Sequence, residues 1–155
     1  MQAIAGKAVC FGQALKPEFA RYAQQVVANC KILASELSEA GMRLVSGGTD
    51  NHMVLVDVTP LGITGQQAEQ ALEAVGIIAN KNAIPFDPQP PRVTSGLRLG
   101  TPAITSRGMA EPEVNKVASM LARVLSDLED KEIQSQVSAE VKALTSKFKV
   151  PGLDS

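Results

Sequence analysis

One arginine, in a stretch where residues alternate, has the type and setting that best suit ligand binding. Arg98 lies in the run Val93-Thr94-Ser95-Gly96-Leu97-Arg98-Leu99-Gly100-Thr101-Pro102-Ala103. Because successive side chains of a strand point to opposite faces, a short strand here would turn Arg98 away from the two neighbouring leucines. A guanidinium on a rigid strand, with Gly96 and Gly100 leaving room beside it, suits bidentate capture of a carboxylate or phosphate. On spacing alone, a solvated arginine or one paired with an acid is the commoner outcome.

Other residue types that carry chemistry are sparse. His52 is the only histidine, and no Cys, Asp or Glu is spaced with it as a metal partner, so we expect a structural histidine hydrogen-bonded near a turn. Cys10 and Cys30 lack a second pair to complete a metal site, and we expect two buried, reduced thiols. Gly47-Gly48 lacks the pattern and the following helix of a phosphate loop. The sequence therefore predicts no metal site.

Size and composition narrow the classes of partner. The 155 residues fit one domain of ordinary size. Lys and Arg number 15 against 16 Asp and Glu, a net charge of -1, and the basic residues are scattered, which argues against binding to nucleic acid or an anionic membrane. Aromatic residues make up 3%, too few for base-stacking platforms. We see no signal peptide and no run that could span a bilayer, so a cytoplasmic location is expected.

Hydrophobic spacing predicts alternating helical and extended segments. Helices are expected over residues 3–15, 17–41, 64–76, 112–128 and 133–148. Gly41 is expected to be the C-cap of the second helix, and Thr64-Gly65-Gln66-Gln67 to form a capping box at the start of the third. Strands are expected over 42–46 and 52–58 as a hairpin, over 77–79, and around Arg98. Asp57 falls on the strand face opposite the valines and is expected to be solvated. The fold class that fits is α+β, a small mixed or antiparallel sheet with helices mainly on one face.

Two features of this arrangement bear on function. The first helix is apolar on most of its sides, which predicts cover from more protein than follows it here. The loop over residues 84–91 carries prolines at 85, 88, 90 and 91. Proline fixes φ, so this loop should hold its shape without ladder hydrogen bonds.

Several segments, taken in order, resemble the C-terminal portion of serine hydroxymethyltransferase. They are Ala5-Gly6-Lys7-Ala8-Val9, Val45-Ser46-Gly47-Gly48-Thr49-Asp50-Asn51-His52, Asn80-Lys81-Asn82, Ile84-Pro85 and the run around Arg98. The resemblance implies the aspartate aminotransferase fold type and a pyridoxal 5'-phosphate enzyme. Such an enzyme interconverts serine plus tetrahydrofolate with glycine plus 5,10-methylenetetrahydrofolate.

The resemblance also implies roles for particular residues. Arg98 would bind the carboxylate of the amino-acid substrate. Asn82 would lie in the folate-contacting loop, with Lys81 and Ala83 as possible neighbours, and no catalysis passes to His52. The family's cofactor-anchoring lysine, the aspartate that pairs with the pyridine nitrogen, the histidine that stacks on the ring and the glutamate of proton transfer have no counterpart here.

Those missing groups belong to the family's larger N-terminal domain. The expectation is therefore a C-terminal segment over residues 1–155, with an interdomain helical segment at 1–40 and the small domain at 41–155. It would be inactive alone, and it would need the missing N-terminal domain and form a homodimer or higher oligomer in the full enzyme. The alternatives are a free-standing, non-catalytic α+β binding module that reuses this fold, and an oligomerisation piece.

Overall fold

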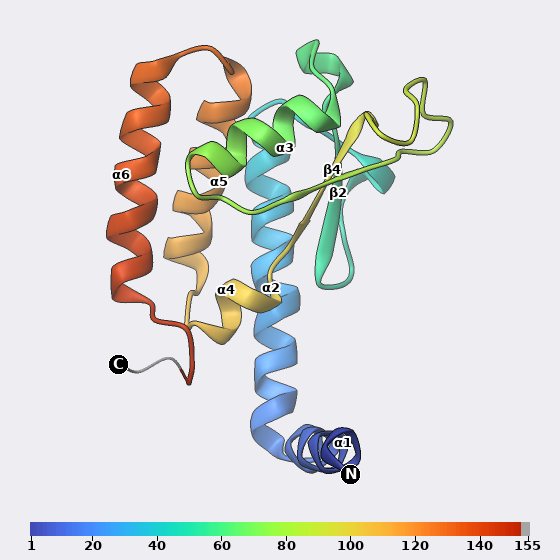
Figure 1. Ribbon diagram of the computed structural model, residues 1–155, viewed down its shortest axis with the longest axis vertical. Helices are drawn as coiled ribbons and strands as arrows, with labels where there is room; N and C mark the ends of the chain where they lie inside the picture. The colour runs from blue at the N-terminus through green and yellow to red at the C-terminus, as the bar shows by residue number, and fades with distance from the viewer. Residues whose placement is uncertain (153–155) are drawn as a thin grey trace.

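The computed structural model describes residues 1–152 of the chain (Figure 1). In these residues the helices are α1 Gln2–Ala14, α2 Pro17–Glu39, α3 Gly65–Ala74, α4 Pro102–Ser106, α5 Glu111–Ser126 and α6 Lys131–Lys147. The strands are β1 Arg43–Leu44, β2 Met53–Asp57, β3 Asn80–Asn82 and β4 Gly96–Gly100. Every segment in which apolar spacing predicts a helix contains one. The short α4 is an addition that the sequence did not predict.

The four strands form one antiparallel sheet in the order β1-β2-β4-β3. The hairpin of β1 and β2 is as predicted, although β1 is only two residues long because the chain turns into a 3₁₀ segment at Val45–Gly47. Helices α2, α3 and α5 lie on the same side of the sheet, and α6 packs outside α5 (Figure 1). The predicted α+β class, with helices mainly on one face, is confirmed.

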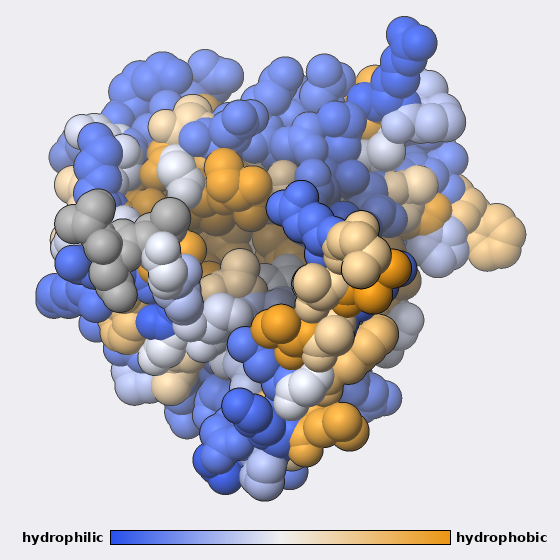
Figure 2. Space-filling view, turned by 60° about the horizontal axis from the view of Figure 1, so that its bottom comes forward, coloured by the Kyte–Doolittle hydropathy of each residue, from blue (hydrophilic) through white to orange (hydrophobic). Residues whose placement is uncertain are grey.

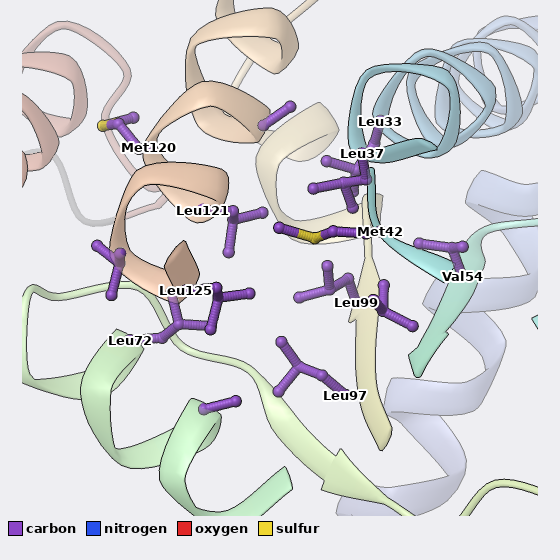
Figure 3. Close-up of a cluster of buried hydrophobic side chains, with 14 of the residues drawn as sticks. Leu33, Leu37, Met42, Val54, Leu72, Leu97, Leu99, Met120, Leu121 and Leu125 are labelled. Atoms are coloured by element: carbon purple, nitrogen blue, oxygen red, sulfur yellow. The ribbon is translucent and has the colours of Figure 1, made fainter. Parts of the chain in front are cut away.

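The hydrophobic core lies between that face of the sheet and the helices (Figure 3). Its fully buried members include side chains from α2, the sheet, α3, α5 and α6, namely Leu37, Val54, Val56, Leu72, Leu97, Leu121, Leu125 and Val137. Each such side chain stabilises the fold by about 1.5–3 kcal/mol relative to an exposed one. The core therefore fixes which face of β4 is inward, and Arg98 is left on the other face.

Helix α2 belongs to the core only over its second half. Its buried residues begin at Val26 and end at Leu37, so the first two turns extend beyond the sheet (Figure 1). The helix ends in a Schellman motif, in which the N–H of Met42 bonds to the carbonyl of Leu37 at 3.0 Å and Gly41 has φ 84°. The C-cap is Ala40, one residue before the predicted one, and Gly41 is the left-handed residue that ends the helix and turns the chain into β1.

Helix α1 packs on almost nothing in this chain. None of its residues is buried, and its large apolar side chains Ile4, Val9 and Phe11 are each more than 60% exposed. Figure 2, in which this end of the molecule is turned toward the viewer, shows hydrophobic residues at the surface. Figure 1 shows α1 crossing the end of α2, away from the sheet and the other helices. The helix was predicted to need further protein for cover, and within residues 1–152 it has none. No helix in this part of the chain is long and apolar enough to cross a membrane.

Two local predictions were wrong. The third strand is Asn80–Asn82, not the apolar triplet before it, and Ile78 is 79% exposed. Cys10 lies on α1 and is exposed, whereas Cys30 is buried in the core as expected. Burial raises the pKa of the Cys30 thiol, against weaker hydrogen bonds with Thr101 and Thr49 that lower it.

Candidate functional site

The open face of the sheet, which the helices leave uncovered, presents Arg98 at the centre of β4. Its cross-strand neighbours are Leu55 on β2 and Asn80 on β3, whose side chains point to the same face. Arg98 is exposed, and among residues 1–152 its guanidinium has no hydrogen bond and no ion pair. The structure therefore gives Arg98 the outward position that alternation predicts. A full positive charge on a central strand is left free to meet an anion.

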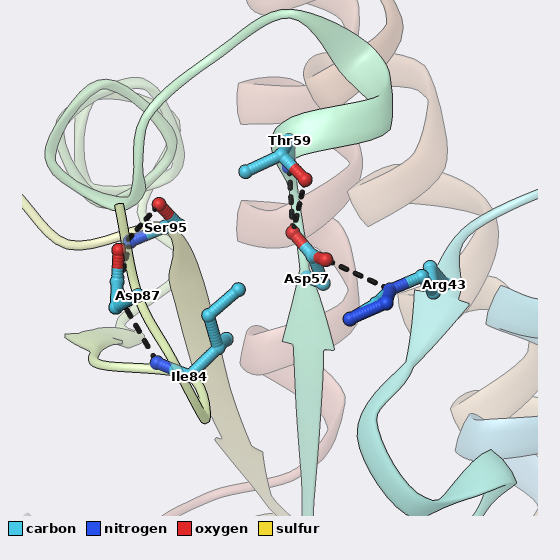
Figure 4. Close-up of polar contacts among 6 residues, drawn as sticks. All are labelled: Arg43, Asp57, Thr59, Ile84, Asp87 and Ser95. Atoms are coloured by element: carbon cyan, nitrogen blue, oxygen red, sulfur yellow. Dashed lines mark hydrogen bonds and ion pairs between the residues drawn. The ribbon is translucent and has the colours of Figure 1, made fainter. Parts of the chain in front are cut away.

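The carboxylate of Asp57, on the same open face, already has hydrogen-bond partners (Figure 4). Asp57 is only 3% exposed, so the prediction that it is solvated was wrong. Arg43 donates from Nε to its Oδ2 at 2.8 Å, and the backbone N–H and hydroxyl of Thr59 donate to its Oδ1 at 2.8 and 2.7 Å. Those partners take up the carboxylate, which is why Asp57 does not neutralise Arg98.

The two glycines that flank Arg98 have different roles. A Cβ on Gly96 would lie 2.6 Å from the carbonyl oxygen of Asn82 and 2.7 Å from Cγ2 of Ile84. Gly96 therefore serves the close approach of β3 to β4, and the prediction that it leaves room for a ligand was wrong. At Gly100 the nearest atom to such a Cβ is the carbonyl oxygen of His52 at 3.4 Å. Within residues 1–152, an added atom therefore has room at Gly100 but not at Gly96.

Asn82 lies on the same open face, at the end of the edge strand. It pairs with Gly96, whereas Asn80 pairs with Arg98, so Asn82 and Arg98 are diagonal neighbours, with about 7–8 Å between such residues in a sheet. The side chain is half-buried, and its Nδ2 donates to the carbonyl of Ala83 at 2.8 Å. Within residues 1–152 its Oδ1 accepts no hydrogen bond. The two predicted site residues are thus brought together.

Lys81 points to the opposite face and takes no part in this arrangement. Its Nζ lies 2.6 Å from Oε2 of Glu69 on α3, and its backbone N–H donates to Oε1 of the same carboxylate at 3.0 Å. These hydrogen bonds lower the pKa of Glu69. Lys81 therefore fastens the edge strand to α3, and its amine is not available on the open face.

One carboxylate, which no sequence pattern singled out, organises the proline-rich loop (Figure 4). Asp87 accepts hydrogen bonds from the backbone N–H groups of Ile84, Gln89 and Ser95 at 3.1, 2.8 and 2.9 Å, and from the Ser95 hydroxyl at 2.7 Å. Desolvation raises its pKa, but the hydrogen bonds outweigh that effect and bring the pKa to about 2. The loop therefore has a fixed shape that joins the end of β3 to the start of β4.

The single histidine contributes through its backbone. The His52 side chain is exposed, and its carbonyl accepts a hydrogen bond from the N–H of Thr101 at 3.1 Å. Within residues 1–152, the predicted hydrogen bond of its ring is not formed. That part of the chain also contains no group of three His, Cys, Asp or Glu residues able to hold a metal ion.

Comparison with known sequences assigns this arrangement to a family. A sequence model of serine hydroxymethyltransferase matches residues 1–121. The chain belongs to the serine hydroxymethyltransferase family. It is 49% identical over 150 residues to serine hydroxymethyltransferase of Endomicrobium trichonymphae, an alignment that covers 97% of this chain. The same alignment covers 36% of that relative, so the chain spans about a third of its length.

Among the described residues, the open face carries no amine of the kind that anchors pyridoxal phosphate. Pyridoxal phosphate enzymes hold their cofactor through a lysine amine. By strand alternation, the side chains on the open face are Arg43, Met53, Leu55, Asp57, Asn80, Asn82 and Arg98. This set contains a free guanidinium and amide groups but no lysine. The open face therefore offers a guanidinium to an anionic group, and the residues described there do not fit the anchoring of such a cofactor.

Proposed function

We propose that this chain supplies the substrate-carboxylate and folate-contacting part of a pyridoxal phosphate-dependent hydroxymethyltransferase. The reaction would interconvert serine plus tetrahydrofolate with glycine plus 5,10-methylenetetrahydrofolate. The observation that carries the proposal is Arg98, a cation without a partner in residues 1–152. It lies on the open face of the sheet, where the carboxylate of Asp57 is already paired with Arg43. The cofactor and its lysine would come from the part of the family's length that lies outside the match.

In this proposal, Arg98 anchors and orients the amino acid. Its planar fork can donate two parallel hydrogen bonds to the α-carboxylate of serine or glycine. Each charge-assisted hydrogen bond contributes about 1.5–3 kcal/mol. A carboxylate held at two points cannot rotate freely, so the bonds around the α-carbon keep one direction relative to the rest of the site. The rigidity comes from β4, which is hydrogen-bonded on both sides.

Asn82 is proposed to contact tetrahydrofolate. Its Oδ1 is free within the described residues, whereas Nδ2 is held by Ala83. An acceptor fixed in this way suits an N–H donor of the folate ring system. The diagonal placement of Asn82 and Arg98 supports a site in which the two substrates lie beside each other.

The exposed apolar side chains of α1 support a partner domain. We propose that residues 1–40 are the interdomain segment, that 41–155 form the small domain, and that α1 packs on a cofactor-binding N-terminal domain. The full enzyme is proposed to be a cytoplasmic homodimer or higher oligomer. The chain by itself should then give no serine-to-glycine turnover with pyridoxal phosphate and tetrahydrofolate. Turnover by the isolated chain would contradict the proposal that the cofactor is bound by a separate N-terminal domain.

The test of the proposed function uses the chain joined to the cofactor-binding segment of its family. Arg98→Ala should raise the KM for serine by at least about 10- to 150-fold, because the loss of even one charge-assisted hydrogen bond of about 1.5–3 kcal/mol corresponds to that range. Arg98→Lys should also be impaired, since one ammonium cannot reproduce the fork.

Arg43→Lys is the matched control for the Arg98 variants. It changes the other arginine of the open face, which is paired with Asp57, and it should leave serine kinetics close to those of the unmodified enzyme. Unchanged serine kinetics in both Arg98 variants would remove the proposed role.

A further inference from the structure

A buried polar network joins α2 to the segment that follows β4. Asn29 of α2 is fully buried. Its Nδ2 donates to the hydroxyl of Thr105 at 2.9 Å and to the carbonyl of Met109 at 3.0 Å, and these partners lie 76 and 80 residues further along the chain. Its Oδ1 accepts a hydrogen bond from Nε2 of Gln25 at 2.8 Å. Both ends of the Asn29 amide are therefore engaged.

The network continues from Thr105 to the end of β4. The Thr105 hydroxyl donates to the carbonyl of Thr101 at 2.8 Å, and the Thr101 hydroxyl donates to the carbonyl of Val26 on α2 at 2.8 Å. Thr101 is also fully buried, and it comes directly after β4, three residues after Arg98. The end of the strand is thus fixed to α2 by two routes, one through Val26 and one through Asn29 and Thr105.

Two members of the network depart from their local preferences. Thr101 is the N-cap of α4, yet its side chain makes no capping hydrogen bond, although a threonine at an N-cap usually accepts one from the first turn. Its hydroxyl is directed to α2 instead. Asn29 lies inside α2, where asparagine is a poor helix former and where a buried amide needs partners to offset its desolvation. Such departures are expected where a functional geometry has to be held.

Helix α2 also connects this network with α1. The buried part of α2 begins at Val26, and the turns before it lead to α1 (Figure 1), which is proposed above to pack on the cofactor-binding domain. A side chain on a strand that is bonded to a helix is held more precisely than one on a loop. The network therefore sets where β4 lies relative to the elements that face the other domain.

We propose that Asn29 is a positioning residue that acts with Thr101 and Thr105 to fix Arg98 relative to α2, and through α2 relative to the cofactor-binding domain. The inference rests on the proposed function and extends it from the residue that binds the substrate carboxylate to those that hold it in place. Within residues 1–152 the guanidinium of Arg98 has no hydrogen bond of its own, so its position depends on the backbone of β4. A misplacement of about 1 Å can cost an enzyme about 100-fold in rate.

The test is a double-mutant cycle in the enzyme completed with its cofactor-binding segment, with the KM for serine as the measured constant. Asn29→Ala should raise this KM about fivefold or more, because Arg98 is displaced. Arg98→Ala should then have an effect at least about threefold smaller in the Asn29→Ala background than in the unmodified enzyme, because a misplaced guanidinium contributes less to binding. Asn29 and Arg98 share no hydrogen-bond partner in residues 1–152, and distant sites of that kind are ordinarily additive. Equal effects of Arg98→Ala in the two backgrounds would overturn the proposal.

Val137→Ala is the control for a loss of stability alone. Val137 is fully buried on α6 and lies outside the network. Its truncation should lower the Tm but leave the serine KM within about twofold and the effect of Arg98→Ala unchanged. A serine KM raised as much by Val137→Ala as by Asn29→Ala would also overturn the proposal.

A pair of variants at Thr105 tests the network where Asn29→Ala does not fold. Thr105→Ser keeps the hydroxyl that accepts from Asn29 and donates to Thr101, and it should have the serine KM of the unmodified enzyme. Thr105→Val keeps the shape but removes the hydroxyl, so it should raise the serine KM and show the same coupling to Arg98→Ala. A lower Tm of Thr105→Val with an unchanged serine KM would make the network structural only and refute the positioning role.

Arg98→Ala by itself separates this inference from the function on which it rests. If Arg98→Ala raises the serine KM while Asn29→Ala and Thr105→Val leave it unchanged, the positioning role is wrong and the proposed function stands. If Arg98→Ala in the unmodified enzyme leaves the serine KM unchanged, both proposals fail.

Discussion

Adding a methyl group at Gly96 of β4 should destabilise the fold, whereas adding one at Gly100 of the same strand should not. Gly96 lies on the central part of the sheet, between β2 and β3. A Cβ there would lie 2.6 Å from the carbonyl oxygen of Asn82, 2.7 Å from Cγ2 of Ile84 and 3.1 Å from Cδ1 of Leu55. Two of these distances are shorter than folded proteins tolerate, and one involves backbone that cannot rotate away. Gly96→Ala must therefore push β3 away from β4.

The size of the effect follows from the cost of overpacking. Extra methyl groups in a well-packed region destabilise a protein by about 1–3 kcal/mol. For a chain of about 150 residues, 1 kcal/mol corresponds to a Tm change of about 2–4 °C. Gly96→Ala should therefore lower the Tm by about 2–12 °C. It should also disturb the placement of Asn82 relative to Arg98, because the displaced strand carries Asn82.

Gly100→Ala provides the control on the same strand. The nearest atom to its added Cβ is 3.4 Å away, which is ordinary contact, and alanine restricts the unfolded chain more than glycine does. Its Tm should be unchanged or slightly higher. The assay is thermal unfolding followed by circular dichroism, with both variants at equal concentration. Equal Tm values for Gly96→Ala and Gly100→Ala would refute the close approach of β3 and β4.

Three further outcomes follow from the polar and thiol groups. Asp57→Ala should lower the free energy of unfolding in urea by about 1–3 kcal/mol, because it removes a buried carboxylate together with its hydrogen bonds to Arg43 and Thr59; an unchanged midpoint would contradict this. The pKa of Asp87 is about 2 when folded, below its usual value, so its stabilisation is present above about pH 4 and is lost as pH falls toward 2. The stability difference between the unmodified chain and Asp87→Asn should accordingly shrink on acidification, and a constant difference would oppose the assignment. Cys10 should react rapidly with a thiol reagent and Cys30 only on unfolding, because Cys30 is buried and its pKa is raised; equal rates in the folded chain would contradict the packing of α2.

Features set by neighbours in sequence could be predicted well. Thr64 and Gln67 form the predicted capping box, with the Thr64 hydroxyl accepting from the Gln67 N–H at 3.2 Å and Gln67 Oε1 accepting from the Thr64 N–H at 2.8 Å. Gly41 is the left-handed residue that ends α2, one residue after the C-cap. Both motifs are complete within a few residues, so their sequence signature contains nearly all the atoms involved. The outward position of Arg98 was predictable for the same reason.

Features set by neighbours in space could not be predicted. The strand β3 is three polar residues, and it exists because β4 offers an edge and Glu69 binds Lys81. Its sequence has no alternation of apolar residues that would reveal a strand. The partners of Asp87 span twelve residues, from Ile84 to Ser95, and their approach depends on turns that no local pattern predicts. Prolines indicated a stiff loop, but not the carboxylate that fixes its shape.

The charges on the strands explain why the proposed anion-binding position is at Arg98. Asp57 forms an ion pair with Arg43, and Lys81 forms one with Glu69. These two ion pairs fasten the edges of the sheet, so neither residue is free to bind a ligand. Arg98 sits between those edges, where both neighbouring strands present side chains that carry no charge, Leu55 and Asn80. Exposure keeps its guanidinium hydrated, so leaving it unpaired costs the fold little. The central strand can therefore hold a free cation rigidly without destabilising the domain, which is what the capture of a substrate carboxylate requires.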